Sequence, residues 1–281
     1  MARGVAEDSK MSSENQRKLP ITILPPRIDT EVAQPATFIF LHGYGWSADQ
    51  FNQHPPNRLS VAYHVHKSPI LQNVKIVIPE GLANIWPSPG KYTWYNIDQP
   101  VPSPGDPLKT NEFGQHHSDV RDIEVSLDYF EHLIDMEVAM GTPANRIVFM
   151  GDSQGASILY LFLLTRRKAA DLAAIITWAG FSATPLETIA QMQERNGLSN
   201  SWAKKTRLYM LHGKEDVFVP LSRSEALATA LERYRARGQG FTTLEWLVLD
   251  GLRHSLVEPV WPYVRKILER VLTETESASK L

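Results

Sequence analysis

A serine between two glycines, in the run Gly151-Asp152-Ser153-Gln154-Gly155, forms a G-x-S-x-G pattern in this sequence. An apolar, β-branched run at 147–150 precedes it and a leucine-rich stretch follows it, so the sequence predicts a strand, a sharp turn and a helix. Because glycine has no Cβ, the strand and helix can approach closely while the serine is held on a strained backbone. The arrangement is typical of a nucleophile elbow, which exposes a reactive hydroxyl group.

A serine hydroxyl is a poor nucleophile at neutral pH, so it needs a general base and an acid that orients the base. On a fold with this elbow the histidine follows the serine in the chain. Of the 9 histidines, only His212 and His254 follow Ser153. His254 comes directly after the last predicted strand, in a loop that can carry an imidazole over the sheet edge. We therefore expect His254 to be the base and His212 to support a turn.

Three carboxylates are candidates for the acid. Asp216 follows a predicted strand, in a loop whose backbone the run Val217 to Pro220 then fixes. Glu215 is one residue away from that position, and Asp250 is too close to His254 in sequence to approach it from a neighbouring strand. We expect Asp216 to orient His254.

Backbone amides are the expected donors to the oxyanion that forms during acyl transfer. One is the amide of Gln154, the residue after the serine, and the other is the amide of Tyr44 in the loop His42-Gly43-Tyr44-Gly45. The glycines of this loop impose little steric bulk, which lets the backbone approach a ligand. The amides act here, so the side chains of these two residues need not take part.

Alternating apolar segments predict the elements that must position these residues. We expect strands at 19–24, 36–41, 74–78, 147–150, 172–178, 206–211 and 243–249. We expect a helix whose apolar repeat runs from Val120 to Val138, with Ser118 as the N-cap and Gly141 just past the C-terminal end. Further helices are expected at 157–165, 222–237 and 256–272, and a partly helical segment at 49–72 is interrupted by Pro55 and Pro56. Continuous apolar strands alternating with helices indicate an α/β fold whose mostly parallel central sheet carries helices on both faces.

The domain organisation follows from the same pattern. Residues 1–18 are expected to be a disordered tail, 19–275 a single domain, and 276–281 a C-terminal tail. Within the domain, 86–117 is rich in proline and aromatic residues and is too long for a simple connection. Trp86, Trp94 and Tyr95 of this loop either line a substrate pocket or pin the loop to the core.

Composition excludes several classes of function. The chain has 281 residues, a formal net charge of -2 and no cysteine, which argues against nucleic-acid or membrane-surface roles and excludes disulfides and thiolate metal sites. No run of about 20 apolar residues predicts a membrane span, and no signal peptide is indicated. The histidine pairs at 64 and 66 and at 116 and 117 lack further ligands at metal-site spacing, so no metal is expected.

The last three residues, Ser279-Lys280-Leu281, match the address that the peroxisomal import receptor reads. We therefore expect the protein in peroxisomes, and otherwise in the cytoplasm.

Five segments together resemble the phospholipase/carboxylesterase family of α/β hydrolases, which includes acyl-protein thioesterases. The segments are FLHGYG, WYNID, NRIVFMGDSQGAS, LHGKEDVFVP and GLRHS, in this order. The resemblance implies the α/β-hydrolase fold and hydrolysis of carboxylic esters or thioesters by Ser153, Asp216 and His254, with Tyr44 and Gln154 as oxyanion donors and no metal or organic cofactor. Asp152 departs from the family, which usually has an apolar aromatic residue there, and its role stays open.

Three functions compete at this point. The first is a serine hydrolase of a small-molecule acyl ester or thioester inside peroxisomes, with the acyl chain and the leaving group undetermined. The second is a cytosolic acyl-protein thioesterase, which the resemblance favours and the Ser279-Lys280-Leu281 ending disfavours. The third is a hydrolase-fold protein that binds a ligand without turnover.

Overall fold

The computed structural model describes residues 21–24, 35–52, 60–83, 92–96, 120–198, 205–256 and 258–278. Within them, seven strands form one sheet in the order β1-β3-β2-β6-β7-β8-β9. The strands are β1 (Ile21–Leu24), β2 (Ala36–Leu41), β3 (Val74–Pro79), β6 (Ile147–Asp152), β7 (Ala174–Trp178), β8 (Arg207–Gly213) and β9 (Thr243–Leu249). Strand β1 is antiparallel to β3 and every other neighbouring pair is parallel, which confirms the predicted mostly parallel sheet.

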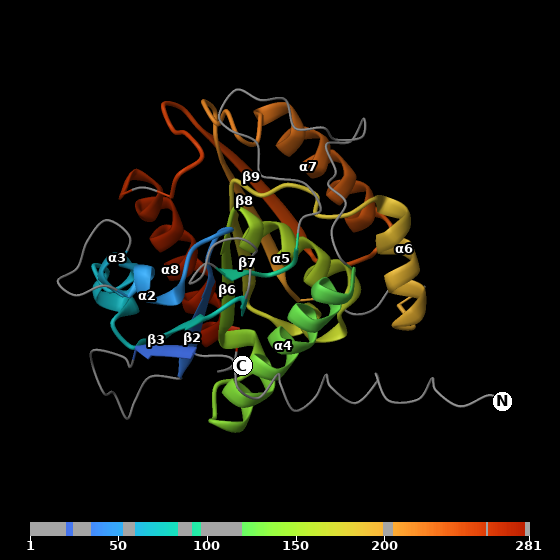
Figure 1. Cartoon of the computed structure of the whole chain (residues 1–281). Helices are drawn as coiled ribbons and strands as arrows, with labels where there is room; N and C mark the ends of the chain where they lie inside the picture. The colour runs from blue at the N-terminus through green and yellow to red at the C-terminus, as the bar shows by residue number, and fades with distance from the viewer. Residues whose placement is uncertain are drawn as a thin grey trace.

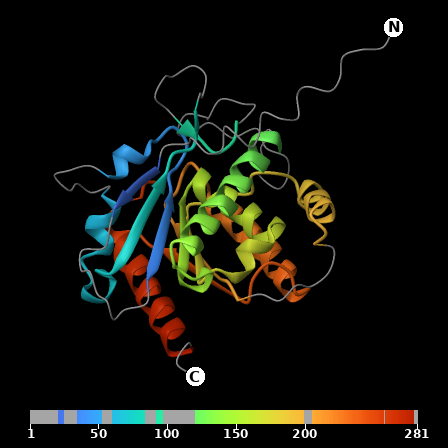
Figure 2. The same cartoon turned by 90° about the horizontal axis from the view of Figure 1, so that it is seen from below.

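Helices cover both faces of this sheet (Figures 1 and 2). One face carries α4 (Val120–Ala139), α5 (Gln154–Thr165), α6 (Leu186–Arg195) and α7 (Leu221–Ala236). The other face carries α2 (Ala48–Phe51), α3 (Val61–Val65) and α8 (Trp261–Ala278). Short 3₁₀ segments lie at Pro69–Leu71, Ala144–Arg146, Arg167–Asp171 and Glu258–Val260.

Strand β6 shows why the central strands are apolar at every position instead of alternating between apolar and polar residues. Ile147 and Phe149 face the helix layer of α4 and α5, whereas Val148 and Met150 face the layer of α3 and α8. Both faces of the central strands are therefore buried, as the continuous apolar runs predicted.

A second, two-stranded sheet joins β4 (Leu82–Ala83) to β5 (Tyr92–Thr93) in antiparallel pairing. Strand β4 follows β3 closely, so the pairing holds residues 92–96 near the carboxyl ends of the central strands. This places part of the proline-rich loop beside the region where Ser153 lies.

Several boundaries differ from the predicted ones. Helix α5 begins at Gln154 rather than at residue 157, because the turn at Ser153 is tight enough for the helix to start at once. Helix α8 runs from Trp261 to Ala278 instead of 256–272, so it extends into the predicted C-terminal tail. Helix α6 was not predicted at all, although Pro185 precedes a strongly amphipathic run. Gly141 has the positive φ of 97° expected of a helix C-terminal cap.

Some predictions concern residues outside the described ranges. These are the tail at 1–18, the break at Pro55 and Pro56, Trp86 with most of the 86–117 loop, the histidines at 116 and 117, and Ser279-Lys280-Leu281. The division into one domain with two tails stays a prediction.

Candidate active site

Ser153 occupies the turn between β6 and α5, where its backbone has φ 52° and ψ -108°. A non-glycine residue at positive φ costs about 1–3 kcal/mol, so the surrounding structure must impose this conformation. A Cβ on Gly151 would overlap the backbone of Gly155, and a Cβ on Gly155 would overlap the carbonyl group of Leu41. Both glycines are therefore needed for the close approach of strand and helix, as the elbow pattern predicted.

The structure brings Ser153, His254 and Asp216 together from separate parts of the chain. The hydroxyl oxygen of Ser153 lies 2.9 Å from Nε2 of His254, and Nδ1 of His254 lies 2.8 Å from Oδ2 of Asp216. Ser153 follows β6, Asp216 follows β8 and His254 follows β9. Because these strands are parallel, their carboxyl ends share one edge of the sheet, and the three side chains meet there.

The loop after β8 holds the buried Asp216 carboxylate in place. Its Oδ1 accepts hydrogen bonds from the amides of Phe218 and Val219, both at 2.9 Å, which leaves Oδ2 for His254. The indole nitrogen of Trp178 in β7 donates to the carbonyl oxygen of His254 at 2.8 Å. The imidazole and its carboxylate partner are thus each fixed by contacts outside the pair.

The other candidates for the base and the acid make different contacts. Nε2 of His212 donates to the carbonyl oxygen of Val219 at 2.8 Å, so His212 supports the loop of Asp216, as expected. Burial lowers the pKa of His212, which favours its neutral form. Glu215 is exposed, and Asp250 forms a surface ion pair with Lys214 at 2.8 Å.

Burial and the neighbouring carboxyl groups shift the pKa of His254 in opposite directions. Burial lowers the pKa of His254, but the hydrogen bond to Asp216, the charge of Asp216 and that of Asp152 together raise it above its ordinary value. Burial raises the pKa of Asp152 to about 7, an effect that His254 reduces and Asp216 increases. Asp152, whose pKa is raised by burial, therefore lies near the hydrogen-bonded trio, and its functional role was not predicted from the sequence.

The predicted oxyanion loop lies between β2 and α2. His42 anchors its start, because Nδ1 of the ring donates to the carbonyl oxygen of Gly43 at 2.8 Å and Nε2 accepts from the amide of Gly81 at 3.1 Å. The amide of Gly45 donates to the carbonyl oxygen of Tyr92 at 2.9 Å. The loop is therefore held by hydrogen bonds on both sides of Tyr44. The role of the Tyr44 amide as an oxyanion donor stays a prediction.

Gln154 contributes more than its amide. As the first residue of α5, it has a backbone N–H without an acceptor in its own helix, as a donor to an oxyanion requires. Its side-chain Oε1 lies 2.8 Å from Oγ1 of Thr93 and accepts from the amide of Trp94 at 3.0 Å, while Nε2 donates to the carbonyl oxygen of Tyr95 at 2.8 Å. The side chain therefore holds residues 93–95 in place through hydrogen bonds, a role that was not predicted from the sequence.

Trp94 and Tyr95 lie in the hydrophobic core and are completely buried. The indole nitrogen of Trp94 donates to the carbonyl oxygen of His42 at 2.8 Å, and its ring packs edge-on against Phe130. These contacts favour the alternative in which the two aromatic residues pin the loop to the core, rather than line a pocket. Trp86, the third of the set, lies outside the described residues.

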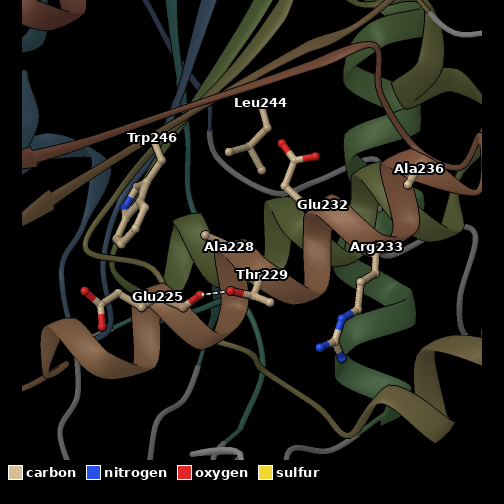
Figure 3. A pocket seen from close by; sticks show the side chains of 8 residues that line it. All are labelled: Glu225, Ala228, Thr229, Glu232, Arg233, Ala236, Leu244 and Trp246. Atoms are coloured by element: carbon tan, nitrogen blue, oxygen red, sulfur yellow. Dashed lines mark hydrogen bonds between the residues drawn. The ribbon is translucent and has the colours of Figure 1, made fainter.

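Further from this trio, an open hollow of about 690 Å³ lies between α7 and the edge strand β9. Figure 3 shows Leu244 and Trp246 of β9 and Glu225 and Arg233 of α7 around it. Ser153, His254 and Asp216 are not among the residues that line it. The hollow is therefore separate from the candidate active site.

Within the described ranges, no three His, Asp or Glu side chains lie close enough together to hold a metal ion. His66 instead lies with Nε2 2.9 Å from the carbonyl oxygen of Val74, and His64 stacks on Trp261. None of the helices described is both long and apolar enough to cross a bilayer.

The sequence matches a known family over most of its length. Residues 28–260 match the phospholipase/carboxylesterase family. The chain belongs to this family. Together with the α/β-hydrolase fold, membership makes the protein a hydrolase of carboxylic ester or thioester bonds.

Individual members of the family are only moderately similar to this chain. Acyl-protein thioesterase 1 of Gibberella zeae is 27% identical over 247 residues, which cover 84% of this chain and 91% of that protein. Acyl-protein thioesterase 1 of Yarrowia lipolytica is 28% identical over 238 residues, with 83% and 92% covered.

Solved structures share the fold at lower identity. SOBER1 of Arabidopsis thaliana has a TM-score of 0.62 at 21% identity, covering 85% of this chain and 99% of that one. Acyl-protein thioesterase 2 of Zea mays has a TM-score of 0.61 at 17% identity, covering 91% of this chain and 100% of that one. The chain therefore has the α/β-hydrolase fold expected of its family.

Proposed function

We propose that the protein hydrolyses the ester or thioester bond of a small-molecule acyl substrate through a Ser153-His254-Asp216 triad and an acyl-enzyme intermediate. This proposal is supported by two consecutive hydrogen bonds. Nε2 of His254 lies 2.9 Å from the Ser153 hydroxyl oxygen, and Nδ1 of His254 lies 2.8 Å from the Asp216 carboxylate. A nucleophile, a base and an orienting acid at these distances form the arrangement needed for acyl transfer.

The reaction begins when Oγ of Ser153 attacks the carbonyl carbon while Nε2 of His254 takes the hydroxyl proton. Nδ1 of His254 carries the other ring proton, because its partner Asp216 is an acceptor, and so Nε2 is free to act as the base. The imidazolium that forms is stabilised by the Asp216 carboxylate. The tetrahedral oxyanion receives hydrogen bonds from the amides of Tyr44 and Gln154, each worth roughly 10²–10³ in rate.

The intermediate collapses when His254 donates its proton to the leaving alcohol or thiol, which breaks the ester or thioester bond and leaves the acyl group on Ser153. A water molecule then loses a proton to Nε2 of His254 and attacks the acyl carbonyl. Collapse of the second tetrahedral intermediate returns the proton to Ser153 and releases the carboxylic acid. No step uses a metal or an organic cofactor.

Loss of the nucleophile tests the proposal. Ser153→Ala should lower kcat for p-nitrophenyl ester hydrolysis by about 10⁴-fold or more, and it should abolish labelling by a fluorophosphonate probe. Ser222→Ala, at an exposed position of α7, serves as the control and should retain both properties. Unchanged hydrolysis by Ser153→Ala would show that another group performs the reaction, and an inert wild type that binds acyl ligands would indicate a binding protein instead.

We also propose that the peroxisomal import receptor binds Ser279-Lys280-Leu281 and that the substrate is therefore encountered in peroxisomes. The support is the sequence of this terminal tripeptide. A fluorescent fusion at the N-terminus should co-localise with a peroxisomal marker, and removal of the last three residues should leave it in the cytoplasm. If that truncation changes nothing, the receptor proposal is wrong.

Removal of a lipid from a protein cysteine is the second candidate function. It is supported by the similarity to proteins named acyl-protein thioesterase 1. A comparison of kcat/KM for a palmitoylated peptide with kcat/KM for acyl-CoA and p-nitrophenyl esters of rising chain length separates the two. Preference for the peptide, combined with cytoplasmic location, would favour this function over hydrolysis of a small molecule.

A further inference from the structure

The carboxyl group of Asp152 lies next to the proposed triad, and the proposed mechanism does not use it. Asp152 is the last residue of β6, directly before Ser153, and only 7% of its surface is exposed. Its Oδ1 is buried and has no hydrogen-bond partner among the described residues. Buried polar atoms in proteins are nearly always paired, so an unpaired carboxyl oxygen at this position needs an explanation.

Three features place this carboxyl beside the reacting groups. A Cβ built on Gly43 would lie 3.2 Å from Oδ2 of Asp152 and 3.4 Å from Cβ of Ser153, so the carboxyl, the nucleophile and the oxyanion loop meet around one point. Asp152 is paired in register with Trp178, whose indole nitrogen binds the carbonyl oxygen of His254. The charge of Asp152 also acts on His254 itself.

No cation of the protein compensates this carboxyl in the described part of the chain. The titratable groups that face it are His254 in the loop after β9 and Asp216 after β8. His42 after β2, Glu80 after β3 and His212 at the end of β8 lie at the same edge of the sheet. His254 is already committed to Asp216, and it must be neutral to act as the base. Among the described residues, Asp152 therefore has no positive partner that is free of other bonds, and a cationic group of a bound substrate would supply one.

We propose that Asp152 is a specificity-determining residue that selects, by charge, esters and thioesters whose leaving group is cationic or neutral near the reacting carbonyl and disfavours anionic ones. The inference rests on the proposed triad and deepens it by naming a substrate class. The leaving group is the part of the substrate concerned, because its departing atom must come within hydrogen-bond reach of His254 to receive the proton. Inside a buried site, a charge several ångströms away acts much more strongly than it would in water.

Three thioacetates of matched size test the inference with one readout, release of a free thiol. Acetylthiocholine has a cationic leaving group, its 3,3-dimethylbutyl analogue is an uncharged isostere, and the thioester of 3-mercaptopropionate is anionic. For the wild type at pH 8, kcat/KM should be about tenfold or more higher for the cationic than for the anionic thioester. The neutral isostere should lie between them.

The pH dependence of this ratio tests the same charge without any substitution. Burial raises the pKa of Asp152 to about 7, so the carboxyl is largely neutral at pH 6 and ionised at pH 8. The cation-to-anion ratio of the wild type should therefore rise across this range. The requirement for a neutral His254 applies equally to all three substrates and cancels in the ratio.

Asp152→Asn should lower the ratio at pH 8 by about tenfold and remove its dependence on pH, and any ratio that remains reflects the different leaving-group acidities of the three thiols. Glu215→Gln, which removes an exposed carboxylate of the same sheet edge, should leave the ratio unchanged. A ratio that is independent of pH in the wild type and unaltered by Asp152→Asn would overturn the inference. In that case Ser153-dependent hydrolysis of the neutral thioester would still support the triad. Loss of that dependence would instead count against the triad itself.

Discussion

Asp216 is the residue whose hydrogen bonds most constrain the geometry of the proposed triad. One of its oxygens accepts two amide hydrogen bonds and the other faces Nδ1 of His254, so its orientation is set before any substrate binds. An imidazole ring held by such a carboxylate presents Nε2 as the acceptor toward Ser153. Glu215, the neighbouring carboxylate, is exposed and takes no part in this geometry.

Asp216→Asn should keep the fold and lower kcat by about 10⁴-fold, because the amide can hold the imidazole in the wrong tautomer. The acid limb of the pH profile of kcat/KM should also move to lower pH, since Asp216 contributes to the raised pKa of His254. Steady-state hydrolysis of a neutral p-nitrophenyl ester between pH 5 and 9 measures both effects. Glu215→Gln is the matched control, and an equal loss in that variant would refute the assignment of Asp216.

At the scale of elements, the site depends on how α5 joins its neighbours. Its first residue, Gln154, ties the helix to residues 93–95, and its second, Gly155, lets the helix start lie against the end of β2. The strand β6, the helix α5 and the segment at 92–96 therefore behave as one packed unit around Ser153.

Gln154→Leu should lower the free energy of unfolding by about 2 kcal/mol, because it leaves buried partners of the clamp without hydrogen bonds. The backbone amide of residue 154 remains, so loss of stability should accompany a smaller loss of activity than in Ser153→Ala. Urea unfolding followed by fluorescence measures the change. Gln191→Leu, on the exposed surface of α6, should alter the free energy by less than about 0.5 kcal/mol.

Gly155→Ala should destabilise the protein by several kcal/mol, because the new Cβ would overlap the carbonyl group of Leu41. Gly141→Ala provides a contrasting control: its Cβ would meet no atom within 4 Å, and only the strain of the positive φ is added, worth about 1 kcal/mol. Thermal unfolding of both variants compares the two effects. Similar losses would mean that close packing at the elbow is not the reason for Gly155.

At the scale of the whole molecule, the sheet buries a carboxyl group that weakens the fold. The pKa of Asp152 rises from 3.8 to about 7 mainly because burial disfavours its charged form. Between these two values the folded protein binds more protons than the unfolded one, so stability contributed by this group falls as pH rises. A loss of stability at the candidate active site is consistent with the conflict between function and stability that is common in enzymes.

Asp152→Asn removes this titration. The difference in the free energy of unfolding between the variant and the wild type should shift in favour of the variant by about 2–4 kcal/mol from pH 4 to pH 8. Urea unfolding at a series of pH values checks the trend, with Glu215→Gln as a control for loss of an exposed carboxylate. A constant difference across this range would show that Asp152 ionises normally in the folded protein.

The sequence by itself determined the local features of this protein. The pattern around Ser153 encodes a strand, a turn and a helix through short-range sterics, and continuous apolar runs encode strands buried on both faces. The order of Ser153, Asp216 and His254 along the chain then follows from parallel strands that end at one edge. The elbow pattern and the apolar runs depend on residues close in sequence, so local spacing is sufficient to predict them.

Only the tertiary structure decided what depends on contacts between distant segments. It placed Asp216 rather than Glu215 against His254, buried Trp94 in the core, and gave the Gln154 side chain its partners 59 to 61 positions away. It also enclosed the carboxyl of Asp152. Burial and hydrogen bonding depend on which segments pack together, and the spacing of residues along the chain does not determine that packing.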